Sequence, residues 1–356
     1  MYRFAVRTEP LRSRAPWLLL TGALAAASSS AQQPPAVTEV VEVREVGVVA
    51  DLPVKMRGLS AAELAARLVI HEDGATRQPT SVVALATGGF ERVLVALDAK
   101  HCDDGLVSAA AAALGGQAAQ LSRLGPVEVA RIGEKEETLL APTNEAETIA
   151  AALARLAASP GCRAGDEVAA GPPPALERIE CPRGNCLLAW IGPGWESREN
   201  GVAAPASRQE LDPLVRRLAG GGWTVLALPV ARRDPTATKR VGKEPETRPG
   251  SKDQVWTINL LARDHSKGQP LSPADYDRFL DVWMAPLRRM TAATAGELAR
   301  WDDEVAARLE AVVGRSVLYY RTDRPASGLP AAVEVREAGP DGRLVRTSEW
   351  APARPR

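Results

Sequence analysis

Two kinds of hydrophobic pattern follow one another along this chain. Residues 38–54, TEVVEVREVGVVADLPV, alternate between valine and polar positions, as half-buried strands do. RLVIHEDGATRQPTSVVAL then predicts a strand, a turn at EDG and a second strand. From residue 91 the pattern changes, because ERVLVALD is a continuous apolar run bounded by charge, typical of a strand buried on both faces. The pattern therefore predicts a small β module followed by a different kind of domain.

Strands and helices alternate in this second domain. Strands are predicted at VEVARIG, TLLAPTN, CLLAWIG, WTVLALPV and SVLYYRT, and QVWTINLLARD is consistent with one more. Helices are predicted at DGLVSAAAAALGGQAAQLSRLG (weakened by its two central glycines), at 144–158, and at QELDPLVRRLAG, SPADYDRFLDVWMAPLRRM and ELARWDDEVAARLEAVVG. The alternation predicts an α/β fold with a doubly wound, mostly parallel sheet of the Rossmann type.

Both ends of the chain contribute to the β module. The tail PAAVEVREAGPDGRLVRTSEW predicts a hairpin around GPDG, so the N- and C-terminal segments are expected to form one module beside the α/β core. The polar stretch ARRDPTATKRVGKEPETRPGSKD is expected to be a solvated loop. The predicted organisation is a signal peptide at 1–31, a linker at 32–37, an N-terminal β module at 38–87, the α/β domain at 88–321, and a C-terminal β hairpin and tail at 322–356.

The N-terminus indicates export. Four arginines precede the apolar run APWLLLTGALAA, and the small residues ASSSAQ follow it, which is the pattern of a secretory signal peptide cleaved after Ala31. An uncleaved N-terminal anchor is the alternative. The apolar run is short for a bilayer span and no later segment is apolar enough, so the mature protein is not expected to be an integral membrane protein. We expect a secreted, periplasmic or cell-envelope protein.

Net charge and the lack of common catalytic motifs argue against two classes of function, nucleic-acid binding and catalysis. Lys+Arg and Asp+Glu both number 44, so the formal net charge is zero and nothing predicts nucleic-acid binding. The sequence contains no G-x-S-x-G, Walker A or H-E-x-x-H motif. We therefore predict no enzymatic activity and no cofactor.

The expected export of the protein determines how its cysteines are interpreted. An oxidising environment favours disulfides, Cys181 and Cys186 enclose CPRGNC, and Cys162 lies in a Pro/Gly-rich stretch nearby. The main prediction is a disulfide between two of these three. A zinc site is the weaker alternative, because a structural site takes four ligands and this half-motif has no second pair.

The order of short motifs resembles a bacterial family related to von Willebrand factor A (vWA), a secreted relative of integrin-type A domains. The resemblance covers roughly residues 38–350. Its motifs are GLSAAELAARLVIHEDG at 58–74, the buried strand at 91–98, PT at 142–143, the strand end at 191–194, the strand at 222–228, TAG at 294–296, the strand at 317–321 and the basic hairpin at 340–345. The resemblance implies a vWA-like fold.

The resemblance also implies a metal-ion-dependent adhesion site, built from Asp-x-Ser-x-Ser, a threonine and a second aspartate, which suits Mg²⁺. Asp98 matches the first aspartate and Thr143 the threonine. Lys100 and Cys102 replace the two serines, and Pro193 replaces the second aspartate. Because a cation, a soft thiol and a proline are poor substitutes for hard oxygen ligands, a degenerate site that holds no metal is predicted.

A partner-binding rim is expected where the strands end, since open α/β sheets bind ligands outside their carboxyl ends. Trp195 is interpreted as an aromatic anchor, or else as a packed loop residue. The implied topology places Cys102 at this edge, apart from the other cysteines and unpaired. The predicted rim consists of His101, Asp103, Asp104, Asn144 and Trp195.

The sequence is therefore interpreted as an exported, non-catalytic protein–protein binding or scaffolding protein of the cell envelope. Two alternatives remain open. One is a metal-binding or metal-dependent enzyme or sensor that uses Asp98, His101 and Cys102. The other is a structural component of a surface or secretion assembly.

Overall fold

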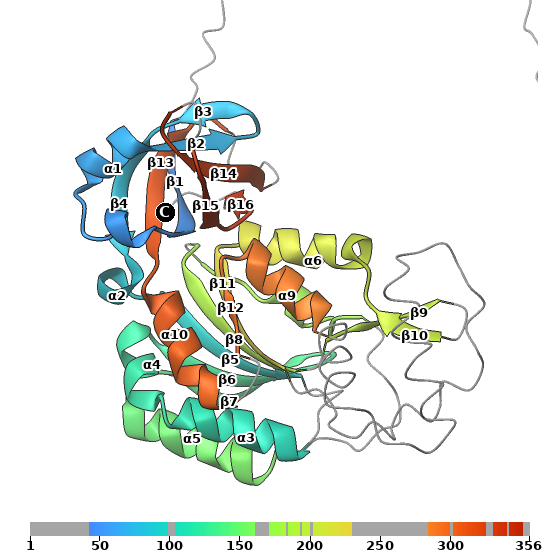
Figure 1. Cartoon of the computed structure of the whole chain (residues 1–356). Coiled ribbons are helices and arrows are strands. Elements are labelled where there is room, and N and C mark those ends of the chain that lie inside the picture. Colours follow the sequence, from blue (N-terminus) through green and yellow to red (C-terminus); the bar gives the residue numbers. More distant parts are fainter. Residues whose placement is uncertain are drawn as a thin grey trace, which may run out of the picture. The chain divides into compact units, whose positions relative to one another are not determined.

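Two separate β-sheets hold most of the strands in the computed structural model (Figure 1). The predicted signal peptide, the linker, the polar loop at 231–253 and the candidate strand QVWTINLLARD lie outside the described residues. The structure describes residues 43–98, 104–160, 171–182, 184–192, 194–199, 202–229, 284–299, 302–324, 330–339 and 342–351.

The first sheet has six strands in the order β12-β11-β8-β5-β6-β7. Five of them pair in parallel, while β7 runs antiparallel to β6 at one edge. β8 is buried at every position, which explains its continuous apolar run. The strands are β5 (Arg92–Asp98), β6 (Val127–Ile132), β7 (Glu136–Thr143), β8 (Cys186–Gly192), β11 (Trp223–Pro229) and β12 (Glu297–Leu298).

Helices cover both faces of this sheet. Along β5, Val93 and Val95 face a core that contains residues of α3, α4, α5 and α10, whereas Leu94 and Ala96 face a core with residues of α6 and α9. The mixed α/β class is therefore confirmed. The helices are α3 (Asp104–Gly115), α4 (Ala118–Leu124), α5 (Ala146–Ala158), α6 (Arg208–Gly220), α9 (Ala285–Ala293) and α10 (Val305–Val313).

The second sheet is antiparallel, in the order β3-β2-β14-β15-β1-β13-β4, and β16 pairs with β14. N- and C-terminal strands therefore share one sheet, as the sequence predicted. The strands are β1 (Arg44–Asp51), β2 (Leu68–Glu72), β3 (Ala75–Arg77), β4 (Pro79–Ala84), β13 (Ser316–Thr322), β14 (Ala331–Glu337), β15 (Leu344–Thr347) and β16 (Trp350–Ala351).

Strand β13 corrects the predicted domain boundary at residue 321. It was assigned to the α/β domain, but it pairs with β1 and β4 in the antiparallel sheet. Its side chains alternate between two cores, because Val317 and Tyr319 join the core beneath α10 while Leu318 and Tyr320 join the core of the antiparallel sheet. The hydrophobic pattern of a strand buried on both faces fits the core of either sheet, so the pattern of β13 did not show which strands it pairs with.

Three other elements differ from the sequence prediction. Helix α1 (Ala61–Arg67) was not predicted, although Ser60 and Glu63 form its capping box. The hairpin of β9 (Glu196–Glu199) and β10 (Val202–Pro205) was also missed. Residues 297–298, predicted as the start of a helix, form strand β12, and the helix itself begins only at Val305. Among the described residues, no helix has the length and apolar character needed to cross a membrane.

Candidate functional site

The carboxyl edge of the parallel sheet is where β5 ends at Asp98, β8 at Gly192 and β11 at Pro229. Asp98 is fully buried and lies beside the end of β8, since Leu97 pairs with Ile191. Gly192 is required there, because a Cβ would lie 2.6 Å from Trp190 Nε1 and 3.0 Å from Asp98 Cβ. The Trp190 indole thus crosses the end of its own strand next to the Asp98 side chain.

Trp195 packs beneath this edge rather than projecting from it. Its side chain is 0% exposed, and its ring centroid lies 5.8 Å from that of Trp190. The Ala206 amide donates to the Trp195 carbonyl, which closes the base of the β9–β10 hairpin. The interpretation of Trp195 as an exposed binding anchor is therefore wrong, and the alternative of a packed loop residue is correct.

Thr143 lies at the opposite end of the sheet, the amino edge, where the parallel strands begin. It pairs with Val127, which in turn pairs with Val93 near the start of β5. Val93 and Asp98 are five residues apart along β5, so Thr143 lies roughly 17 Å from Asp98 along the strand direction. The Thr143 hydroxyl instead accepts a hydrogen bond from the Glu145 amide, 3.1 Å away, just before α5. Thr143 and its exposed neighbour Asn144 therefore cannot share a site with Asp98, which corrects both predictions.

The sequence carries a signal for this reversal. β6 ends at Ile132 and β7 begins at Glu136, so only three residues connect them. A parallel connection needs a crossover of a dozen or more residues, so the short link already requires an antiparallel hairpin. Once β7 is antiparallel, the residue that ends it lies at the amino edge.

Helix α5 consequently runs from the amino edge to the carboxyl edge. Near its end, the Ala157 carbonyl accepts a hydrogen bond of 2.5 Å from the hydroxyl of Ser108, near the start of α3. Arg131, close to the carboxyl end of β6, donates to the Pro160 carbonyl at 3.1 Å. The expected direction of α5 was therefore wrong, and with it the argument that placed Cys162 far from Cys102.

Several predicted site residues cannot be placed. Asp104 is described only as the first backbone position of α3. The degenerate ligand set therefore remains a prediction from the sequence. The predicted residues outside the described part of the chain are Lys100, His101, Cys102, Asp103, Cys162 and Pro193.

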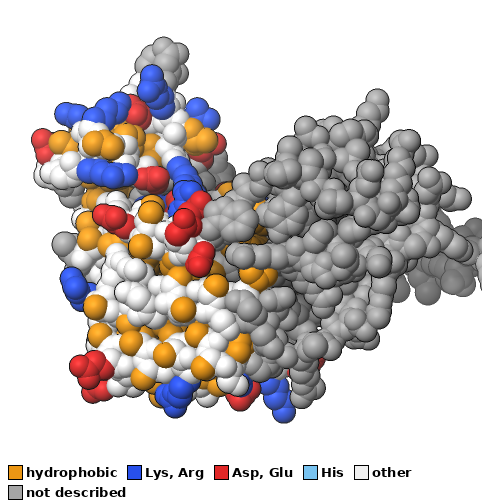
Figure 2. All heavy atoms as spheres, turned by 60° about the horizontal axis from the view of Figure 1, so that its bottom comes forward, with side chains coloured by type: hydrophobic (Ala, Val, Ile, Leu, Met, Phe, Trp, Pro, Cys, Tyr) orange, Lys and Arg blue, Asp and Glu red, His pale blue; other side chains and the backbone are white. Residues whose placement is uncertain are grey.

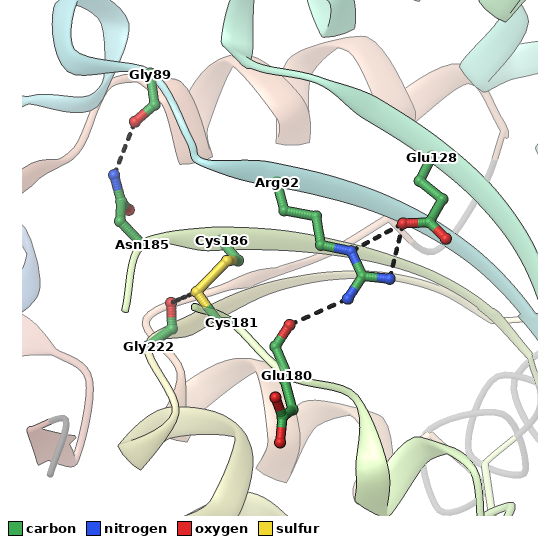
Figure 3. The surroundings of a disulfide bond; sticks show 8 residues. All are labelled: Gly89, Arg92, Glu128, Glu180, Cys181, Asn185, Cys186 and Gly222. Atoms are coloured by element: carbon green, nitrogen blue, oxygen red, sulfur yellow. Dashed lines mark hydrogen bonds and ion pairs between the residues drawn. A yellow bond between two sulfur atoms is a disulfide. The ribbon is translucent and has the colours of Figure 1, made fainter. Parts of the chain in front are cut away.

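A disulfide joins Cys181 to Cys186 at the amino edge, which confirms the pairing of two of the three candidates (Figure 3). The Cys186 amide donates to the Gly222 carbonyl at 3.0 Å, and Asn185 Nδ2 donates to the Gly89 carbonyl at 2.7 Å. The six-residue CPRGNC loop is thus tied to the turns that precede β5 and β11.

An ionic cluster missed by the sequence analysis lies next to the disulfide (Figure 3). Arg92 donates from Nε to Glu128 at 2.9 Å and forms an ion pair with Glu136 at 3.0 Å. Its guanidinium also donates to the Glu180 carbonyl and lies 5.8 Å from the Trp223 ring centroid. One cation therefore faces two carboxylates, and its charge is compensated within the cluster. The available sequence signal was Glu128, which lies between two valines near the start of the strand VEVARI, because a charged residue at a buried position is almost always paired.

No family model and no curated protein matches this chain. Similar solved structures include an aerotolerance-related membrane protein from Bacteroides fragilis, at 14% identity over 62% of this chain and 98% of that one, with a TM-score of 0.34. The manganese-loaded TRAP protein of Plasmodium vivax is similar at 8% identity over 78% and 97% of the chains, TM-score 0.33. A von Willebrand factor type A protein from Catenulispora acidiphila is similar at 9% identity over 88% and 74%, TM-score 0.24. Because these sequence identities and TM-scores are low, any function proposed for this chain must rest on its own strand order and site.

Proposed function

We propose that this chain is an exported, non-catalytic protein-binding or scaffolding protein of the cell envelope, built on a doubly wound, vWA-like α/β domain. The observation that carries the proposal is the strand order β7-β6-β5-β8-β11-β12. Numbered along the chain within this sheet, it is 3-2-1-4-5-6, and Asp98 ends the first strand. In sheets of this order the ligand binds at the switch point, which here lies between the carboxyl ends of β5 and β8.

The proposed binding does not use Mg²⁺ in the manner of an adhesion site. Supporting this, Asp98 ends β5 at the carboxyl edge, whereas Thr143 ends β7 at the amino edge. Lys100 follows Asp98 by two residues, where the adhesion motif has a serine. A lysine ammonium about 4 Å from a divalent ion would cost on the order of 8 kcal/mol at an effective dielectric near 20. We therefore propose that the partner binds without a bridging cation.

A protein partner fits the described surface better than a nucleic acid. In the face shown in Figure 2, the described Lys/Arg and Asp/Glu side chains are interspersed rather than gathered into a patch of one sign. Nucleic-acid binding generally depends on a basic face that neutralises phosphates. Together with the zero formal net charge, this favours a partner recognised by shape and local polar contacts.

Mg²⁺ and Mn²⁺ are expected to leave the stability of the mature protein unchanged. The check is thermal unfolding in EDTA and in excess Mg²⁺ or Mn²⁺, because an ion at a hundred times its dissociation constant would stabilise the fold by about 2.7 kcal/mol. The Lys100→Ser variant removes the competing cation and is the matched comparison. A rise in Tm with Mg²⁺ for the parent, reversed by EDTA, would show an intact adhesion site.

Partner contact is expected at the carboxyl edge and not at the amino edge. A photoreactive amino acid at position 104, where α3 begins, should cross-link a specific envelope protein in the presence of EDTA. The same probe at Asn144, exposed at the amino edge, is the matched control and should give no such product. Equal cross-linking from both positions, or cross-linking only with Mg²⁺, would contradict the proposal.

A further inference from the structure

A second group of possible metal ligands lies at the amino edge, at the opposite end of the sheet from Asp98. Glu91, Cys181 and Cys186 each present one ligand atom, and these atoms all lie within 4.8 Å of one another. Tetrahedral zinc, with Zn–S near 2.3 Å and Zn–O near 2.1 Å, separates its ligand atoms by about 3.5–3.8 Å. Once the sulfur–sulfur bond is broken, changes of little more than an ångström or two in these separations would bring the three atoms to about the distances that zinc needs.

We propose that reduction of the Cys181–Cys186 disulfide converts this cluster into a site for a thiophilic divalent cation such as Zn²⁺. Two thiolates and the Glu91 carboxylate would hold the ion, with water in the fourth position. While the disulfide is intact, the two sulfurs are bonded to each other and cannot serve as thiolate ligands. The sequence showed only a cysteine half-motif, and the third ligand comes from the residue just before β5.

The redox step is an exchange with an external dithiol. The dithiol is oxidised to its own disulfide, and the Cys181–Cys186 bond takes up the two electrons and two protons to give two thiols. Metal binding then displaces the two thiol protons, so affinity is expected to fall as the pH is lowered. Attack would occur at Cys181, because its side chain is partly exposed whereas Cys186 is buried.

The backbone positions the ligands independently of the sulfur–sulfur bond. The Glu91 amide donates to the Asn185 carbonyl at 2.9 Å, which joins the first ligand to the cysteine loop. On the other side, Gly222 accepts from the Cys186 amide and adopts φ +81°, and a Cβ there would lie 2.2 Å from the Gly184 carbonyl oxygen. This close approach of two backbones holds the loop in place, so the site is preorganised after reduction.

The local charge permits a cation. The cation Arg92 directly follows Glu91, but its guanidinium is directed toward Glu128 (Figure 3). It is also paired with Glu136. Two carboxylates offset its single positive charge. Glu91 is only partly buried, so an ion and its water molecule can reach the cluster from solvent.

Cobalt binding tests the proposal, because Co²⁺ substitutes for Zn²⁺ and its thiolate complexes absorb in the near ultraviolet. The mature chain should carry Cys102→Ser and Cys162→Ser, so that Cys181 and Cys186 are the only sulfhydryls. After reduction with a phosphine, we expect one Co²⁺ per chain with a thiolate charge-transfer band, displaced by Zn²⁺. The oxidised protein should show no band.

Single variants separate the proposed ligands from their surroundings. Cys181→Ser should abolish the band, and Glu91→Gln should weaken binding at least about tenfold, the scale of losing even an outer partner of a metal ligand. Glu180→Gln, a neighbouring carboxylate outside the cluster, is the matched control and should bind like the parent. No band in the reduced protein, or equal affinities of Glu91→Gln and the parent, would overturn the proposal.

Loss of structure on reduction would not obscure the result. Circular dichroism of the reduced protein reports whether the fold persists without metal. If it does not, Zn²⁺ should restore the folded spectrum of the parent and fail to restore that of Glu91→Gln at the same concentration. Restoration of both, or of neither, would contradict the assigned role of Glu91.

Discussion

Replacing Glu72 with alanine is expected to lower the free energy of unfolding by about 3–5 kcal/mol, the usual cost of removing one partner from a buried ion pair. The Glu72 carboxylate is 3% exposed and accepts hydrogen bonds from Tyr320 at 2.9 Å and Thr322 at 2.7 Å. It also pairs with Arg324 at 3.2 Å and Arg77 at 3.5 Å. The substitution would leave two hydroxyls and two guanidinium groups without this acceptor. Urea unfolding measures the effect.

Tyr320 remains a hydrogen-bond donor in this cluster at any physiological pH. Burial raises the pKa of its hydroxyl well above the ordinary value, and the neighbouring Glu72 charge raises it further. The matched control is Glu334→Ala, which removes an exposed carboxylate paired with exposed Arg336 and should cost less than about 1 kcal/mol. A loss below about 1 kcal/mol for Glu72→Ala as well would show that this network contributes little.

Glu297→Ala is the second substitution expected to destabilise the fold by about 3–5 kcal/mol. Glu297 begins β12, at the edge of the parallel sheet, and pairs with Arg315 and with Arg346, 2.8 Å away. Arg315 directly precedes β13 and is 0% exposed. Burial and, to a smaller extent, the Arg346 charge lower the pKa of Arg315 to about 10, although Glu297 opposes both effects. Without Glu297 a buried cation would face a second cation, and chemical denaturation measures the cost.

Two further variants identify the cause of that loss. Arg308→Ala removes a half-exposed partner of the same carboxylate and should change stability by less than about 1 kcal/mol. Adding Arg315→Met to Glu297→Ala removes the uncompensated buried charge and should recover part of the stability. If the double variant Glu297→Ala/Arg315→Met is instead less stable than Glu297→Ala alone, the destabilisation by Glu297→Ala does not come from leaving the Arg315 charge unpaired.

Local hydrophobic pattern was sufficient to predict most elements. The break between α3 and α4 falls at the predicted glycine pair, and the buried strands β5 and β8 coincide with their apolar runs. These predictions succeeded because burial on one or both faces is imposed on consecutive residues. The prediction failed at β12, which was expected to be helical. The strand conformation of its two residues depends on pairing with β11 and on the arginines around Glu297, which are distant in sequence.

The candidate site was predicted less completely than the fold. Asp98 does end the central strand, and two of the three candidate cysteines, Cys181 and Cys186, do form a disulfide. Thr143 and Trp195 were misplaced, because the same alternating pattern fits a strand that runs in either direction and an indole that points in or out. Only the three-residue link between β6 and β7 held the missing information on direction.

By itself the sequence determined most of the element types, the α/β class and the presence of a disulfide among Cys162, Cys181 and Cys186. Each of these depends on residues close in sequence or on periodicity. Tertiary structure alone decided that β13 belongs to the antiparallel sheet and that Glu91 lies beside the cysteine pair. These depend on which distant segments pair and in which direction, and hydrophobic periodicity is the same for every choice of partner.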